Sequence, residues 1–101
     1  MYHDTYDNIP VPKGNVSIFP SIYEANNVLV SIIGDKEGLL YLAELLKYMA
    51  EVNVEQQGMP EGERAHIPLQ AGKHLIDHSS EVQICRAEAK GSGDYPDYFE
   101  I

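Results

Sequence analysis

Three histidines and a cysteine are the side chains in this sequence that are best suited to metal chemistry. His66, His74, His78 and Cys85 fall in the second half of the chain, together with Asp77. Zinc needs three or four such ligands that converge on one point. The spacing of these residues matches no established zinc motif. We therefore name the three histidines as the only metal candidates and expect no metal or other cofactor.

Nucleophilic catalysis is a second chemistry to test. Ser79 and Ser80 follow His78 directly, but a nucleophile needs a base and an orienting acid in space, and neighbours along the chain seldom provide that geometry. Cys85 lies in a predicted strand and is interpreted as a small hydrophobic residue. We predict no catalytic residues and a protein that is not an enzyme. A small metal-dependent enzyme is the least favoured alternative.

The elements that would position these side chains follow from hydrophobic periodicity. Alternating and β-branched residues predict two strands over residues 16–33, joined by a turn around Ala25-Asn26-Asn27, and two more strands at 65–69 and 82–85. Asp35 is a good N-cap for a helix over residues 36–52. The order predicts an α+β fold with a four-stranded antiparallel sheet (β-β-α-β-β) and one amphipathic helix packed on one face.

Domain organisation follows from length and composition. A chain of 101 residues makes one domain. We expect an irregular N-terminal arm over residues 1–15, a single α+β domain over 16–89, and a flexible acidic and aromatic C-terminal arm over 90–101.

The predicted helix has an apolar stripe that should pack on the sheet. The residues expected in this core are Leu39, Leu42, Ala43, Leu46 and Met49 of the helix and Val28, Val30, Ile32, Ile67, Leu69, Val82 and Ile84 of the strands. By strand alternation, Phe19, Tyr23, Leu29 and Ile33 then lie on the opposite face. One helix leaves that face uncovered, so we predict that it binds a partner, a second copy of the chain, or the chain's own arms.

The charge of the chain restricts its partners. Sixteen acidic residues against seven basic ones give a net charge of −9, which disfavours nucleic acid because that ligand requires clustered Lys and Arg. A cationic protein fits this charge, although acidity also serves solubility alone. Carboxylates and aromatic side chains are the candidate contacts, since such residues suit interfaces with basic partners. They are Glu55, Glu61 and Glu63 in a loop and Asp94, Tyr95, Asp97 and Tyr98 in the C-terminal arm.

The expected cellular compartment follows from three features that the sequence lacks. Cys85 is the single cysteine, the N-terminus lacks the pattern of a signal peptide, and no segment approaches the ~18 apolar residues of a membrane span. We expect a cytoplasmic protein that does not interact with membranes.

Three segments resemble a bacterial family, the immunity-like proteins of polymorphic toxin systems, in the thirty-second family of that set. The resemblance covers about residues 28–86. Its segments are Val30-Ser31-Ile32-Ile33-Gly34-Asp35-Lys36-Glu37-Gly38-Leu39-Leu40-Tyr41-Leu42-Ala43-Glu44-Leu45-Leu46, then His66-Ile67-Pro68-Leu69, and Ser80-Glu81-Val82-Gln83-Ile84. The resemblance implies a small α+β protein that binds and neutralises a cognate toxin. It implies no catalytic residues.

The sequence leaves two candidate functions. The first is a non-catalytic binding protein, specifically an immunity protein that masks a basic toxin. The second is a homo-oligomeric structural or regulatory protein, such as a homodimer, that uses the second sheet face.

Overall fold

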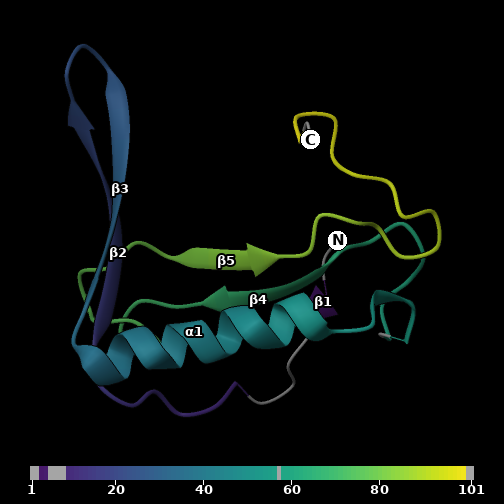
Figure 1. Cartoon of the computed structure of the whole chain (residues 1–101), viewed down its shortest axis with the longest axis horizontal. Coiled ribbons are helices and arrows are strands. Elements are labelled where there is room, and N and C mark those ends of the chain that lie inside the picture. Colours follow the sequence, from purple (N-terminus) through teal and green to yellow (C-terminus); the bar gives the residue numbers. More distant parts are fainter. Residues whose placement is uncertain (1–2, 5–8, 57, 100–101) are drawn as a thin grey trace.

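A computed structural model describes residues 3–4, 9–56 and 58–99 of the chain (Figure 1). It confirms the α+β class and the predicted order of two strands, a helix and two strands. The elements are β1 (His3–Asp4), β2 (Val16–Tyr23), β3 (Asn27–Gly34), α1 (Lys36–Glu51), the short 3₁₀ helix η1 (Val54–Gln56), β4 (Ala65–Leu69) and β5 (Val82–Cys85). β1 lies in the segment that we expected to be irregular.

The strands form two sheets, which corrects the expectation of a single four-stranded one. β2 and β3 make an antiparallel hairpin, while β4 pairs with β5 antiparallel and with β1 parallel. The cause lies at the outer edge of β2, which a loop occupies in place of a strand. Ile76 N–H donates to the carbonyl of Val16 at 3.1 Å, and Ser80 N–H donates to that of Ile18 at 2.8 Å. These bonds join the hairpin to the rest of the molecule only at its base.

Helix α1 begins where the sequence predicted. The carboxylate of Asp35 accepts a hydrogen bond from Gly38 N–H at 2.7 Å, as expected of an N-cap. The same carboxylate accepts from the backbone N–H of Asn15 at 3.0 Å. These hydrogen bonds to the ionised form lower the pKa of Asp35. The cap therefore ties the segment before β2 to the first turn of the helix.

Gly38 makes this close packing possible. A Cβ atom at this position would lie 2.1 Å from the carbonyl oxygen of Asn15, far inside van der Waals contact. Any side chain would push the helix away from Asn15 and loosen the cap at Asp35.

The core lies between α1 and the β4–β5 layer. The buried helix residues Tyr41, Leu42, Leu45 and Met49 belong to one cluster with Ala65, Ile67 and Leu69 of β4, and Val82 and Ile84 pack at its margin. Leu39, Ala43 and Leu46 were expected in this core, and that prediction was wrong, because all three are exposed. The two leucines are nearly half exposed, at 43% and 48%. The buried stripe is rotated by roughly a quarter turn about the helix axis from the predicted one, because Tyr41 and Leu45 face the sheet.

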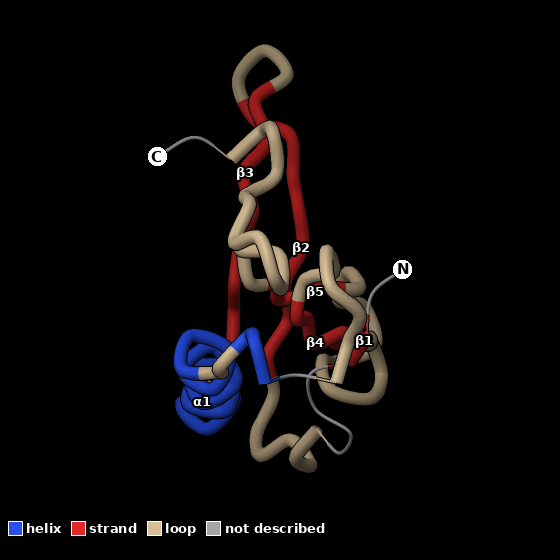
Figure 2. The backbone as a smooth tube through the Cα atoms, turned by 90° about the vertical axis from the view of Figure 1, so that its right-hand side faces the viewer, coloured by secondary structure: helices blue, strands red, loops and turns tan. Residues whose placement is uncertain are grey.

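The β2–β3 hairpin stands away from this core. Figure 1 shows it rising from the start of α1, and Figure 2 shows the same separation from the side. Val28, Val30 and Ile32 were expected to pack on the helix, but all three are exposed, so that prediction was also wrong. The hairpin beyond its base is a two-stranded ribbon with both faces uncovered.

Candidate functional site

The three candidate histidines do not form a metal site. Across the described part of the chain, no three His, Cys, Asp or Glu side chains come close enough together to hold an ion. His66 is buried on β4, His74 is buried in the loop after it, and His78 is exposed. Nδ1 of His74 accepts a hydrogen bond from the backbone N–H of Gln70 at 3.0 Å. Burial, with the nearby charge of Lys73, lowers the pKa of His74 and so favours its neutral form.

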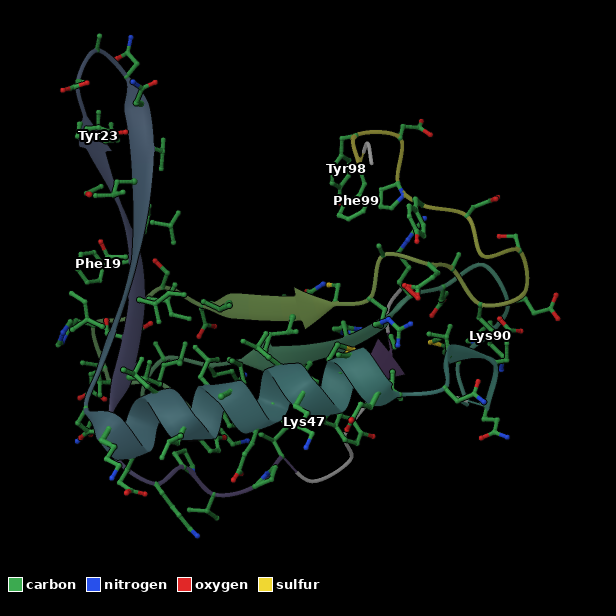
Figure 3. The ribbon with its side chains drawn as sticks, viewed as in Figure 1. Phe19, Tyr23, Lys47, Lys90, Tyr98 and Phe99 are labelled. Atoms are coloured by element: carbon green, nitrogen blue, oxygen red, sulfur yellow. The ribbon has the colours of Figure 1, made fainter. Side chains whose placement is uncertain are left out.

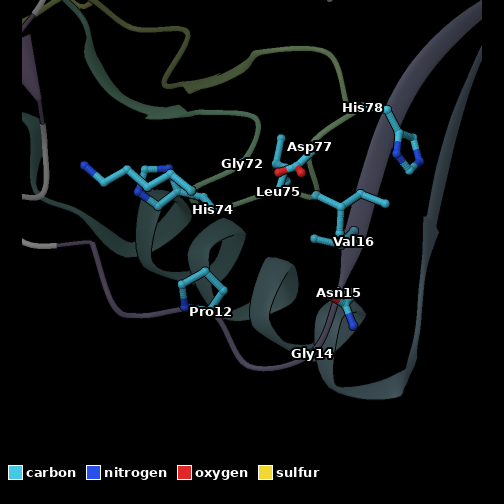
Figure 4. A pocket seen from close by; sticks show the side chains of 11 residues that line it. Pro12, Gly14, Asn15, Val16, Gly72, His74, Leu75, Asp77 and His78 are labelled. Atoms are coloured by element: carbon cyan, nitrogen blue, oxygen red, sulfur yellow. The ribbon is translucent and has the colours of Figure 1, made fainter.

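His74 and His78 line the same pocket, which Figure 4 shows from close by. The pocket has a volume of about 550 Å³ and lies between residues 12–16 and the loop 72–78. Ser79 follows this loop, but its hydroxyl serves the fold. Its Oγ accepts from Ile18 N–H at 2.9 Å and is 3.0 Å from the Ile18 carbonyl oxygen. The hydroxyl that the sequence placed beside His78 thus anchors β2.

A second pocket, of about 670 Å³, lies at the base of the hairpin. Its walls include the apolar side chains of Phe19, Ile33 and Ile76. Ser17 also lines it and is buried, and its Oγ has no hydrogen-bond partner among the described residues. The pocket could receive an apolar side chain of a partner.

One face of the hairpin carries the four apolar residues that the sequence assigned to partner binding. Phe19, Tyr23, Leu29 and Ile33 all have the same parity in the β2–β3 register, so they point to one side. Tyr23, Leu29 and Ile33 are exposed and Phe19 is half-buried. In Figure 3, Phe19 and Tyr23 lie on the side of the hairpin turned away from β5. The structure therefore brings this group together.

The opposite face of the hairpin is entirely apolar, and the sequence reasoning missed it as a surface. Its cross-strand pairs are Ile18–Ile32, Pro20–Val30 and Ile22–Val28. Residues 28–33 are apolar at both parities except for Ser31. That pattern was the available signal, since a strand with one solvated face alternates apolar and polar residues.

The second group of predicted contact residues lies in a loop and an arm that the fold joins. Gly91 N–H donates to the carboxylate of Glu55 at 2.9 Å, Gly62 N–H to the carbonyl of Lys90 at 2.8 Å, and Lys90 N–H to that of Glu63 at 2.9 Å. These bonds bring the loop 53–63 beside residues 88–94. We call the surface that carries Glu55, Glu61, Glu63, Asp94, Tyr95, Asp97 and Tyr98 the acidic end. It lies across the molecule from the hairpin (Figure 1).

The basic side chains at the acidic end are bound to backbone carbonyl groups. Arg64 donates to Ala87 O at 2.8 Å, and Nζ of Lys90 donates to Met59 O at 2.9 Å. Arg86 donates to the carbonyls of Met49 and Val52, where α1 ends. It also pairs with Glu88, and this hydrogen bond lowers the pKa of that carboxyl group.

Two carboxylates of the acidic end have a different environment. Glu61 and Asp97 are exposed. The cationic groups are thus held against the protein, while Glu61 and Asp97 face solvent.

Aromatic rings complete the acidic end. Tyr95 and Phe99 meet edge to face, with ring centroids 5.4 Å apart. Tyr98 is 87% exposed, and Figure 3 shows it beside Phe99 in the C-terminal arm. An exposed tyrosine next to carboxylates is typical of a protein-binding surface.

Comparison with known proteins adds one positive result. The sequence profile of the family described as Immunity protein 32 matches residues 30–87. No curated protein and no solved structure matches the chain. Within the described residues, no helix has the length and apolar character needed to cross a membrane. Because the matched segment is more than half of the sequence and contains α1, β4 and β5, the chain belongs to the Immunity protein 32 family.

Proposed function

We propose that this chain is a cytoplasmic, non-catalytic immunity protein that neutralises a cognate bacterial toxin by binding it. The observation that carries the proposal is the family match over residues 30–87. A family of immunity proteins implies a toxin as the partner. The folding role of the Ser79 hydroxyl and the hydrogen bond accepted by His74 support a binding role over a catalytic one.

The acidic end is the surface that we assign to the toxin. Its cations are engaged by backbone carbonyls, while exposed carboxylates and the ring of Tyr98 face outward. The net charge of −9 over the chain has the same sign. Opposite fields speed the encounter of two proteins, so a basic toxin surface suits this face.

A growth assay tests the function itself. A toxin identified from the genes that neighbour this one would be expressed in a sensitive bacterium with and without the immunity protein. We expect growth only when both are present, and a complex of the two on affinity capture. Cells that die equally in both cases would overturn the proposed function.

Charge reversal tests the surface. In one variant Glu61 and Asp97 become Lys, and in a matched control Glu37 and Glu44 on the exposed side of α1 become Lys. Both variants have the same net charge, so any difference between them reports position. We expect the first variant to associate with the toxin at least about tenfold more slowly and with a weaker salt dependence, because rim charges act mainly on the association rate. Equal rates for the two variants would move the binding surface elsewhere.

The structural or regulatory homo-oligomer is the second candidate function. The uncovered hairpin favours it, but self-association there would leave the acidic end free.

A further inference from the structure

Among the described residues, the edge of β3 that faces away from β2 pairs with no strand, and this feature is independent of toxin binding. The backbone groups of Val16 and Ile18 form hydrogen bonds with the loop 76–80. The N–H and C=O groups of these two residues therefore point away from β3. Residues of an antiparallel strand alternate between facing the partner strand and facing away from it. By the β2–β3 register, Val28, Val30 and Ile32 then direct their N–H and C=O groups away from β2. None of these groups has a partner among the described residues.

In the part of the chain that the structure describes, this edge has none of the usual protection. Natural edge strands are blunted by charged side chains, Pro, bulges or a covering element. The sequence of β3, Asn27–Gly34, has no charge and no proline. Its side chains Val30 and Ile32 are 60% and 54% exposed. A two-stranded hairpin is also only marginally stable in water, and three or more strands with an apolar face are needed for stability.

We propose that two copies of this chain pair through their β3 strands, antiparallel about a two-fold axis at Val30. Val30 then lies opposite its own copy, and Val28 lies opposite Ile32 of the partner subunit. The result is a four-stranded sheet in the order β2-β3-β3-β2. The two apolar faces join on one side of it, because rotation about an axis normal to the sheet keeps each face on its own side.

The low charge of the hairpin allows a second copy to approach this edge. Two chains of net charge −9 repel each other, so they approach most easily where charge is lowest. Residues 16–34 contain a single charged side chain, Glu24, in the turn. The pairing also places each hairpin tip beside the base of the other, next to the first turn of the partner's α1. Leu39 and Leu40 are exposed there and extend the apolar contact toward the ~800 Å² per partner of a standard interface.

Mass measurement on the protein alone tests the proposal. Sedimentation equilibrium across a concentration series should show the wild type reaching twice the monomer mass of 11.3 kDa. Val30→Lys places two ammonium groups face to face at the axis and should raise the dimer dissociation constant at least about tenfold. Ile22→Lys is the matched control, because Ile22 is 76% exposed on the same apolar face but lies on β2. It should leave the dimer intact, and circular dichroism should show both variants folded.

Cross-linking tests the register. In a Cys85→Ser background, Val30→Cys should form an intermolecular disulfide, because a hydrogen-bonded pair has Cα atoms about 5.5 Å apart, within the range for a disulfide. Leu29→Cys in the same background should not, since the two copies of that residue lie more than about 7 Å apart. A wild type that stays monomeric, a dimer that Val30→Lys leaves intact, one that Ile22→Lys also dissociates, or equal cross-linking at both positions would each overturn the proposal.

Discussion

The helix core can be tested with two adjacent leucines of identical chemistry. Leu45 is 1% exposed and belongs to the core between α1 and β4, whereas Leu46 is 48% exposed. Truncating a fully buried leucine to alanine removes its transfer free energy and leaves a cavity, for a loss of about 2–5 kcal/mol. Leu46 has only about half of its surface buried, so its truncation should cost about 1 kcal/mol or less.

Urea denaturation at neutral pH measures the difference. With a slope of about 1–3 kcal/mol per molar urea for a small domain, Leu45→Ala should lower the midpoint by at least about 0.7 M. Leu46→Ala, at about 1 kcal/mol or less, should move the midpoint by at most about half as much. The slope itself should stay constant, because neither change alters how much surface unfolding exposes.

The comparison can contradict the packing described above. If Leu46→Ala lost as much free energy of unfolding as Leu45→Ala, the helix would present the other stripe to the sheet. The core assignment of Tyr41 would then fail as well, since it lies on the stripe of Leu45.

Three further predictions concern single groups. Asp35→Ala should cost about 1 kcal/mol of unfolding free energy by removing the N-cap, Asp35→Asn should cost less, and equal losses in urea titrations would contradict a capping role. The lowered pKa of His74 means that the unfolded chain binds protons more readily, so thermal stability should fall as pH drops below about 6.5. His74→Asn keeps an acceptor for Gln70 N–H, and its melting temperature should no longer fall over this pH range. A pH dependence equal to that of the wild type would refute the attribution of the fall to His74. Ser17→Ala should raise stability by about 1 kcal/mol because it removes a buried hydroxyl without a described partner, and a loss of that size would show that the hydroxyl is hydrogen-bonded.

The limits of the sequence reasoning are clearest in α1. The Asp35 cap and the predicted span of 36–52 came close to the observed Lys36–Glu51. The buried stripe could not be chosen, because the helix is apolar over more than one stripe and both candidate stripes contain Leu42 and Met49. What decides between them is a contact far away in the sequence. The hydroxyl of Tyr41 donates to the carbonyl of Pro10 at 2.8 Å, which fixes that ring inside the core.

The hairpin shows a different limit. Alternation correctly placed Phe19, Tyr23, Leu29 and Ile33 on one face, because the register of a tight hairpin is local. It could not show whether β2 continues into the second sheet. The loop that takes the edge of β2 does so through backbone groups and the Ser79 hydroxyl, and nothing in the composition of residues 76–80 predicts that role.

The residues of the acidic end were named as contacts from residue types alone, and their binding role stays a prediction. Acidic and aromatic residues in two distant segments indicated a surface, and the structure joins those segments by backbone hydrogen bonds. The engagement of Arg64 and Lys90 by carbonyl groups depends on chain geometry, so net charge gave no indication of it.

The contact between Gly38 and Asn15 has a consequence for the evolution of this family. No side chain fits at Gly38, and the carboxylate of Asp35 binds the backbone N–H of the same residue, Asn15. Selection should therefore keep the spacing Gly34-Asp35-x-x-Gly38 in relatives whatever toxin each one meets. A search guided by that short pattern would find proteins that share this architecture. Positions such as Glu61 and Tyr98 should instead diverge as each relative adapts to its own toxin.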